Sequence, residues 1–245
     1  DTARSRGLGD VYKRQTSLSA AFASSSNLFS NRLRSPDQKY MGDFAAPKLD
    51  IIKIALIGVG YRGQGHIKRF GSFPNTKIVA ISDLHETNIS KSLSIIDNLK
   101  TSKSHTNPKT YYGNKDKWRL MLKETDADIV VISTDWDTHG IMAIETMKNN
   151  MHAFVEVPLA NTIKDLWEIV NTSEKFQKHC MMMENVNYGR EELMFLNICR
   201  KGLLGELYHG EAAYIHDLRW QMYEEEIGTG SWSCLLYTSD AADDP

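Results

Sequence analysis

The sequence lacks the features of several protein classes. Its 245 residues include only three cysteines, Cys180, Cys199 and Cys234, too few for a disulfide framework and without the Cys-x-x-Cys or His-x-x-x-His spacing of a zinc site. Lys and Arg number 29 against 31 Asp and Glu, and the net charge of −2 argues against a basic nucleic-acid footprint or a polyacidic tail. No run reaches the roughly 18 apolar residues of a membrane-spanning helix. The sequence therefore predicts a globular protein with no nucleic-acid partner, no metal site and no membrane span.

Both ends of the chain differ in pattern from its middle. Residues 1–15 (DTARSRGLGDVYKRQ) show the apolar spacing of neither a strand nor a helix. Residues 234–245 (CLLYTSDAADDP) follow a segment that breaks off at Gly-Ser-Trp. We expect both ends to be adapter-derived sequence outside the fold. A natural terminus without regular structure is the alternative.

Residues 16–50 are expected to be a leader remnant followed by a surface arm. The stretch from Thr16 to Asn31 is rich in Ser and Ala, and Ala21-Phe22-Ala23 fits the small-x-small pattern of a signal-peptidase site. This pattern favours an exported or periplasmic bacterial protein. A flexible Ser-rich linker in a cytoplasmic protein is the alternative.

The middle of the chain alternates between short apolar runs and amphipathic stretches. Strands are expected at residues 51–57, 77–82, 128–133, 152–156 and 180–184, and helices from near Gln64 and at 86–99, 115–124, 139–149, 162–178 and 191–201. Strands separated by helices pair in parallel, so residues 51–187 predict an α/β fold with a Rossmann-type, doubly wound parallel sheet. A longer strand over 206–215 predicts that residues 188–233 are the incomplete start of an α+β domain with a mostly antiparallel sheet.

A glycine-rich turn follows the first expected strand and predicts a dinucleotide site. Gly58, Gly60 and Gly63 form a Gly-x-Gly-x-x-Gly motif, and Asp83 ends the next strand twenty residues after Gly63. In this context the glycines permit a tight turn, close approach of a pyrophosphate, and close packing of the helix on the sheet. Asp83 would accept hydrogen bonds from ribose hydroxyls and repel a 2′-phosphate, which favours NAD over NADP. A structural turn beside a solvated aspartate is the alternative.

Polar segments follow three further strands. These are residues 133–139, residues 156–158, and the pair Asn185 and Tyr188. Because ligands bind beyond the carboxyl ends of strands in open α/β sheets, these segments predict one shared site.

Several motifs together resemble glycosyl hydrolase family 109, a branch of the Gfo/Idh/MocA oxidoreductase-like superfamily. The similarity covers residues 40–232. The motifs are GVGYRGQGH, the Trp-x-x-His segment 136–139, EVPLA at 156–160, MMMENVNYGRE at 181–191 and AAYIHDLR at 212–219.

The resemblance implies two sets of site residues. Contacts to NAD are implied at Tyr61, Arg62, Asp83, Trp136, Asp137, Thr138, His139, Glu156, Val157 and Asn185. Contacts to the substrate are implied at Tyr188, Arg200, Tyr214, Ile215, His216 and Asp217.

Known members of this family are NAD-dependent α-N-acetylgalactosaminidases. The resemblance therefore implies a glycan substrate with a terminal α-linked N-acetylgalactosamine. It also implies a metal-independent cycle in which NAD oxidises C3 of the sugar, the C1 leaving group is eliminated, water adds, and the hydride returns. NAD would be regenerated at each turnover and stay tightly bound.

One departure from the wider superfamily bears on proton transfer. Its sugar dehydrogenases carry Glu-Lys-Pro where this chain has Glu156-Val157-Pro158, and a valine exchanges no proton. Proton transfer then moves to catalytic candidates His216, Tyr188 and Tyr214. His216 is the preferred acid/base because imidazole titrates nearest neutral pH. A histidine on a strand surface is the alternative.

Two other functions remain open at this point: an NAD-dependent sugar dehydrogenase, and a non-catalytic NAD-binding protein. We expect the chain as given to bind NAD but to show little or no glycosidase activity, because later strands of the second domain are absent from it. Family resemblance also implies a homo-oligomer.

Overall fold

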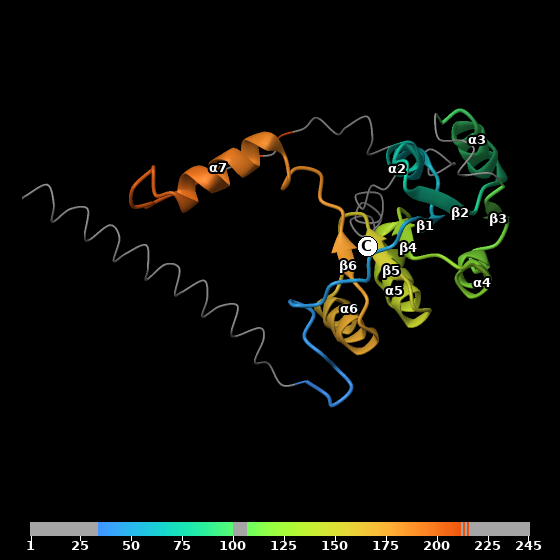
Figure 1. The fold of residues 1–245 in the computed structure, drawn as a ribbon, viewed down its shortest axis with the longest axis horizontal. Helices are drawn as coiled ribbons and strands as arrows, with labels where there is room; N and C mark the ends of the chain where they lie inside the picture. Colours follow the sequence, from blue (N-terminus) through green and yellow to red (C-terminus); the bar gives the residue numbers. More distant parts are fainter. Residues whose placement is uncertain (1–33, 100–106, 212, 214, 216–245) are drawn as a thin grey trace, which may run out of the picture. The chain divides into compact units, whose positions relative to one another are not determined.

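The computed structural model describes residues 34–99, 107–211, 213 and 215 (Figure 1). The chain groups into two compact units: residues 44–184 form the body of one, and residues 185–211 belong to the other. The first unit contains the sheet, and the second contains α7 (Arg190–Arg200). Within the described residues, no helix is both long and apolar enough to cross a membrane.

The described strands form a six-stranded parallel sheet in the order β3-β2-β1-β4-β5-β6. The strands are β1 (Ile52–Ile57), β2 (Thr76–Ser82), β3 (Lys109–Tyr111), β4 (Ile129–Ile132), β5 (His152–Val155) and β6 (Cys180–Met182). This is the strand order of the Rossmann fold, and the direction of winding reverses between β1 and β4. The predicted fold class is confirmed.

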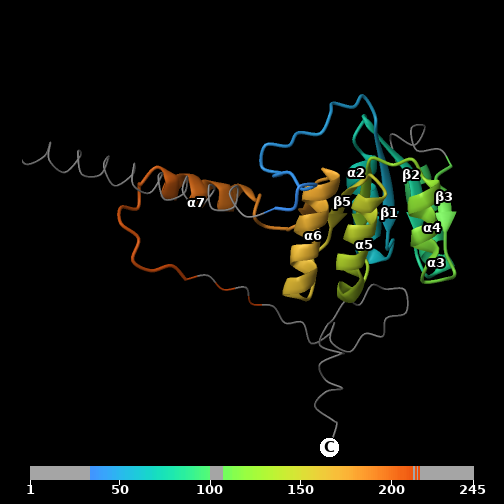
Figure 2. The same ribbon diagram turned by 90° about the horizontal axis from the view of Figure 1, so that it is seen from below.

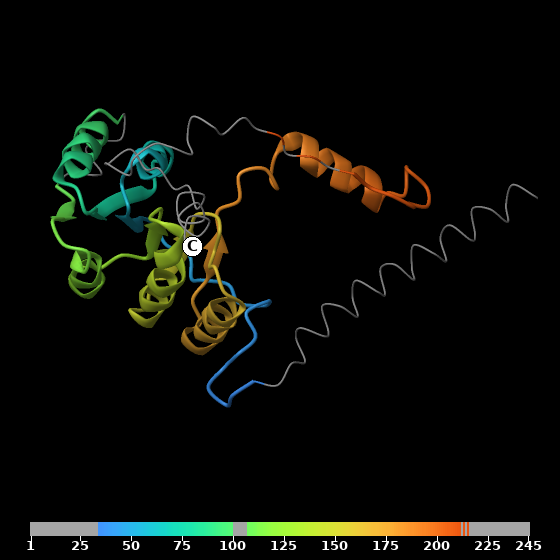
Figure 3. The same ribbon diagram turned by 180° about the vertical axis from the view of Figure 1, so that it is seen from behind.

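Helices cover both faces of the sheet. They are α2 (Tyr61–Gly71), α3 (Glu86–Asp97), α4 (Lys117–Glu124), α5 (Trp136–Lys148) and α6 (Ile163–Phe176). Ile67 of α2 and Ile89 of α3 share one buried core, whereas Trp118, Met142 and Ile169 bring α4, α5 and α6 into the other. Figure 2 shows α4, α5 and α6 in one layer beside the sheet, and Figure 3 shows the layers from behind.

Strand β1 shows why the sequence folds this way. Ile54 and Leu56 pack into the core beneath α2 and α3, whereas Ala55 and Ile57 pack into the core beneath α4, α5 and α6. All four side chains are at most 2% exposed. A strand buried on both faces reads as a continuous apolar run, and this pattern made the sheet recognisable from sequence.

The structure differs from the expected elements at one strand that was not predicted, at the starts of two helices and at one strand that is not formed. The short strand β3 (Lys109–Tyr111) was not predicted. Helix α2 begins at Tyr61 rather than near Gln64, and α5 begins at Trp136 rather than at His139. The strand expected over 206–215 is wrong, because the described residues of that range lie in no strand. A strand persists only where a second strand takes up its backbone hydrogen bonds, and the described residues offer this segment none.

His152, at the start of β5, holds a hydrogen bond that acidification is expected to disrupt. Its Nδ1 accepts a hydrogen bond of 2.9 Å from the backbone N–H of His179. Burial, together with the nearby charges of Lys178 and His179, lowers the pKa of His152 from 6.5 to about 4, although Asp128 opposes the shift. Between pH 6.5 and about pH 4, His152 therefore stays neutral in the folded protein, whereas in the unfolded chain it already binds a proton.

The resulting contribution to stability is present above pH 6.5 and lost as the pH falls to about 4. Asparagine keeps an acceptor near the position of Nδ1 but does not titrate. We therefore expect His152→Asn to lose less stability on acidification than the wild type, by up to about 3 kcal/mol. Urea unfolding between pH 7 and pH 4 measures this difference. His209→Asn, at an exposed histidine, serves as the control, and an equal loss in all three proteins contradicts the prediction.

Candidate functional site

The candidate site lies at the carboxyl ends of the central strands, where the winding of the sheet reverses. The loops after β1, β2, β4 and β5 meet at this edge and carry most of the residues predicted to bind NAD. Reversal points of this kind form the ligand crevice of open α/β sheets.

The glycine turn between β1 and α2 has no room for side chains. Gly58 has a φ of +79°, and a Cβ there would lie 2.5 Å from the carbonyl oxygen of Ser133. A Cβ on Gly63 would collide with the carbonyl oxygen of Gly58. The turn therefore brings bare backbone to the sheet edge, as close approach of a pyrophosphate requires.

The start of α2 is suited to an anion. Gly60 occupies the N-cap position and has no side chain with which to cap the helix, and the first turn contains no acidic residue. The first N–H groups of a helix have no partner within the helix and carry a partial positive charge. The residues present therefore fit the phosphates of a dinucleotide.

Asp83 joins the glycine turn to the end of β2. Its Oδ2 accepts a hydrogen bond of 2.8 Å from the backbone N–H of Val59. Its Oδ1 accepts hydrogen bonds from the backbone N–H of His85 at 2.9 Å and from Nδ2 of Asn88 at 3.1 Å. These bonds fix the carboxylate beside the turn, and its contact with a ribose stays a prediction.

Glu156 forms the main charged cluster of this edge. Its Oε1 lies 2.7 Å from Nε of Arg62 and 2.6 Å from Nε2 of His66. Burial alone would raise the pKa of Glu156, but the hydrogen bonds from His66 and Arg62 and the charge of Arg62 lower it to about 2. Glu156 is therefore a carboxylate at neutral pH and acts as a hydrogen-bond acceptor.

The loop after β4 is ordered by its own polar groups. Asp135 caps α5 by accepting a hydrogen bond of 3.2 Å from the backbone N–H of Thr138. The hydroxyl of Thr138 lies 2.8 Å from that of Thr134. Asp137 accepts a hydrogen bond of 2.6 Å from Asn161, and Trp136 begins the helix.

His139 is buried beneath the two loops that follow β4 and β5. Its Nδ1 lies 2.7 Å from the carbonyl oxygen of Pro158, and its Nε2 lies 3.1 Å from the carbonyl oxygen of Thr134. Only 1% of the residue is exposed. The imidazole therefore links the loops from inside, while the neighbouring Val157 is 39% exposed.

The structure brings together only part of the predicted site. The glycine turn, Tyr61, Arg62, Asp83, residues 136–139, Glu156 and Val157 belong to the unit that contains the sheet. Asn185, Tyr188 and Arg200 belong to the other unit, where Tyr188 is 71% exposed. Ile215 is exposed, and Tyr214, His216 and Asp217 lie outside the described residues. The roles predicted for all these residues stay predictions.

Sequence reasoning missed His66, which is 3% exposed and contacts Glu156. Arg62 and His66 are four residues apart in α2, so they share one face of the helix. That spacing was available in the GVGYRGQGH motif. The missing information was the place of Glu156, which lies 90 residues later in the chain than His66.

Two protein-family models match this chain, one in each of its two parts. Residues 52–184 match the model of the oxidoreductase family with the NAD-binding Rossmann fold. Residues 188–234 match the model of the glycosyl hydrolase 109 C-terminal domain.

Several curated proteins of Shewanella are similar to this chain in sequence. A glycosyl hydrolase family 109 protein of Shewanella putrefaciens is 50% identical over 193 residues, which are 79% of this chain and 41% of that protein. An alpha-N-acetylgalactosaminidase of Shewanella oneidensis matches with the same identity and coverage. The chain thus spans about two fifths of the length of these relatives.

Solved structures share the fold at low sequence identity. The WlbA dehydrogenase from Bordetella pertussis, in complex with NADH and UDP-GlcNAcA, has a TM-score of 0.55 and 18% identity, covering 64% of this chain and 44% of that one. Scyllo-inositol dehydrogenase from Lactobacillus casei, with bound NAD(H) and scyllo-inositol, has a TM-score of 0.54 and 14% identity, covering 64% and 43%. At these identities the likeness establishes the fold alone.

Proposed function

This chain belongs to the Gfo/Idh/MocA oxidoreductase family and to its glycosyl hydrolase 109 branch, and from this premise we propose two things. The unit built on residues 44–184 binds NAD. The whole protein hydrolyses glycans at a terminal α-linked N-acetylgalactosamine, without a metal, and keeps the same NAD bound through successive turnovers.

The glycine turn between β1 and α2 supports the first part of the proposal. Gly58 and Gly63 leave no space for a Cβ, and the uncapped start of α2 meets the same turn. This arrangement fits a pyrophosphate resting on backbone N–H groups. Asp83, fixed against Val59, supplies the acceptor for ribose hydroxyls. Its charge disfavours a 2′-phosphate, which supports NAD over NADP.

Glu156 and Val157, at the end of β5, would hold the cofactor rather than move protons. When bound, NAD would supply the hydride acceptor for C3 of the sugar and return the hydride at the end of the cycle. Glu156 has a pKa of about 2, far from the value that suits proton exchange near neutral pH. Val157 has no proton to exchange. We therefore assign proton transfer to His216, assisted by Tyr188 and Tyr214.

The experiment joins this chain to the downstream region that its relatives carry and supplies p-nitrophenyl α-N-acetylgalactosaminide. We expect release of p-nitrophenol without added NAD, no net accumulation of NADH at 340 nm, and NAD recovered from the denatured protein. Accumulation of NADH with free sugar would instead identify a dehydrogenase. If neither reaction occurs although NAD is bound, the protein is a non-catalytic NAD-binding protein. His216→Ala tests the acid/base, and unchanged turnover would reject its assignment.

A further inference from the structure

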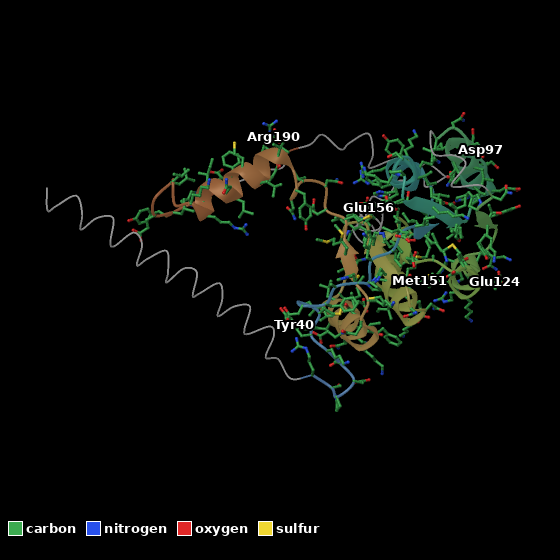
Figure 4. All side chains as sticks on the ribbon, viewed as in Figure 1. Tyr40, Asp97, Glu124, Met151, Glu156 and Arg190 are labelled. Atoms are coloured by element: carbon green, nitrogen blue, oxygen red, sulfur yellow. The ribbon has the colours of Figure 1, made fainter. Side chains whose placement is uncertain are left out.

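Two donors on one face of α2 reach the same carboxylate oxygen at the end of β5. Arg62 and His66 are one helical turn apart, and Glu156, marked in Figure 4, is the first residue after β5. Nε of Arg62 lies 2.7 Å from Oε1 of Glu156, and Nε2 of His66 lies 2.6 Å from it. The cluster thus crosses the point where the winding of the sheet reverses.

The shared contact leaves the second carboxylate oxygen available. No hydrogen bond joins Oε2 of Glu156 to any of the described residues. The Glu156 side chain is 11% exposed, whereas that of His66 is 4% exposed. Glu156 therefore retains an acceptor at the crevice, while His66 contacts the carboxylate from inside the protein.

The chemistry of the contact fixes which imidazole nitrogen carries the hydrogen. An ionised carboxylate only accepts hydrogen bonds, so Nε2 of His66 must be the donor to Glu156. Nδ1 is buried and has no hydrogen-bond partner among the described residues. A buried Nδ1–H would leave a donor unsatisfied, which favours the Nε2–H form and makes the contact with Glu156 the main polar function of His66.

We propose that His66 is a positioning residue for NAD binding. It holds Oε1 of Glu156 so that Oε2 accepts a hydrogen bond from a hydroxyl group of the bound dinucleotide. This inference rests on the proposed function, since it needs NAD to bind at this edge. Arg62 holds the same oxygen but is half exposed, so His66 is the donor that restricts the carboxylate from the buried side.

The test compares His66→Leu and His66→Gln in the full chain, with NAD⁺ as the probe and calorimetric titration as the readout. Leucine fills much of the space but donates no hydrogen bond, and glutamine keeps an N–H near the position of Nε2. We expect leucine to raise the dissociation constant for NAD⁺ by about 10- to 100-fold, as loss of a hydrogen bond to a charged group predicts, and glutamine to restore it to within about threefold.

Ile67→Val is the matched control, because Ile67 is the fully buried neighbour of His66 and belongs to the apolar core on one face of the sheet. It is expected to lower the melting temperature without changing the affinity for NAD⁺. Equal affinity for NAD⁺ in the wild type and His66→Leu, or no rescue of that affinity by glutamine, overturns the inference but not the proposed function. Absence of NAD⁺ binding by the wild type overturns the proposed function and the inference with it.

A measurement on the wild type keeps the inference testable if His66→Leu does not fold. Long-range ¹H–¹⁵N spectra distinguish the two imidazole nitrogens. We expect the hydrogen of His66 on Nε2, and a change in its chemical shift when NAD⁺ is added. A hydrogen on Nδ1 alone, or a spectrum insensitive to NAD⁺, contradicts the proposed role.

Discussion

Replacing Gly63 with alanine is expected to abolish measurable NAD⁺ binding and to lower the free energy of unfolding by about 3 kcal/mol or more. The new Cβ would collide with the carbonyl oxygen of Gly58. That oxygen belongs to the backbone and cannot rotate away as a side chain would. Relief requires α2 to move from the sheet or the glycine turn to open, and either movement removes the cradle on which the phosphates would rest.

Gly65→Ala is the matched control in the same helix. Gly65 is exposed, and a Cβ there would meet no atom within 4 Å. Alanine is the better helix former, so we expect this variant to gain about 0.5–1 kcal/mol of stability and to bind NAD⁺ as the wild type does. Urea unfolding and NAD⁺ titration measure both effects. Similar behaviour of the two variants would show that the close approach at Gly63 is unimportant.

The central sheet was predictable because burial on both faces leaves a simple pattern. Strand β4 is a continuous apolar run followed by polar residues, and β1 is apolar except for Lys53 and is followed by the glycine turn. Strand β3 escaped prediction because Lys109 and Thr110 are exposed and only Tyr111 is buried. It is held by pairing with Ala80–Ser82, and no local pattern in its own sequence reveals such a partner.

Helix starts were predicted less well than helix bodies because the first turn packs little. Tyr61 is 81% exposed, so the apolar periodicity of α2 becomes visible only later in the helix. The start of α6 was found because Thr162 and Asp165 form a cap that the sequence displays. The backbone N–H of Asp165 donates to the hydroxyl of Thr162 at 3.1 Å, and that hydroxyl donates to the Asp165 carboxylate at 2.7 Å.

The polar contacts of the site were the least predictable part. The motif located Gly58, Gly63 and Asp83 because their spacing is fixed by one strand, one turn and one helix. By contrast, the contact of Arg62 with Glu156 joins residues 94 positions apart. Sequence spacing indicates that both lie at the crevice. Only the packing of α2 against the sheet shows that Oε1 of Glu156 already accepts hydrogen bonds from Arg62 and His66.

Replacing Glu156 with leucine is expected to lower the free energy of unfolding by about 3–5 kcal/mol at pH 7, because His66 then keeps a buried donor without an acceptor and Arg62 loses its ion pair with Glu156. The pKa of Glu156 is lowered from 4.5 to about 2. Its contribution to stability is therefore complete above pH 4.5 and lost as the pH falls toward 2. We expect the difference between wild type and variant to shrink by about 3 kcal/mol over that window.

Urea unfolding at a series of pH values from 7 to 2 follows this convergence. His152, with a pKa of about 4, titrates in both proteins, so its effect cancels in the difference. Glu145→Leu is the control, since Glu145 forms a surface ion pair with Lys148 at 3.4 Å that contributes less than about 1 kcal/mol. A loss for Glu156→Leu that is no larger than the control, or that is equal at every pH, would show that the carboxylate is not held ionised by its two partners. If the stabilities of the wild type and Glu156→Leu converge on acidification while the control difference does not change, the ionised carboxylate of Glu156 is the charge that stabilises this edge of the sheet.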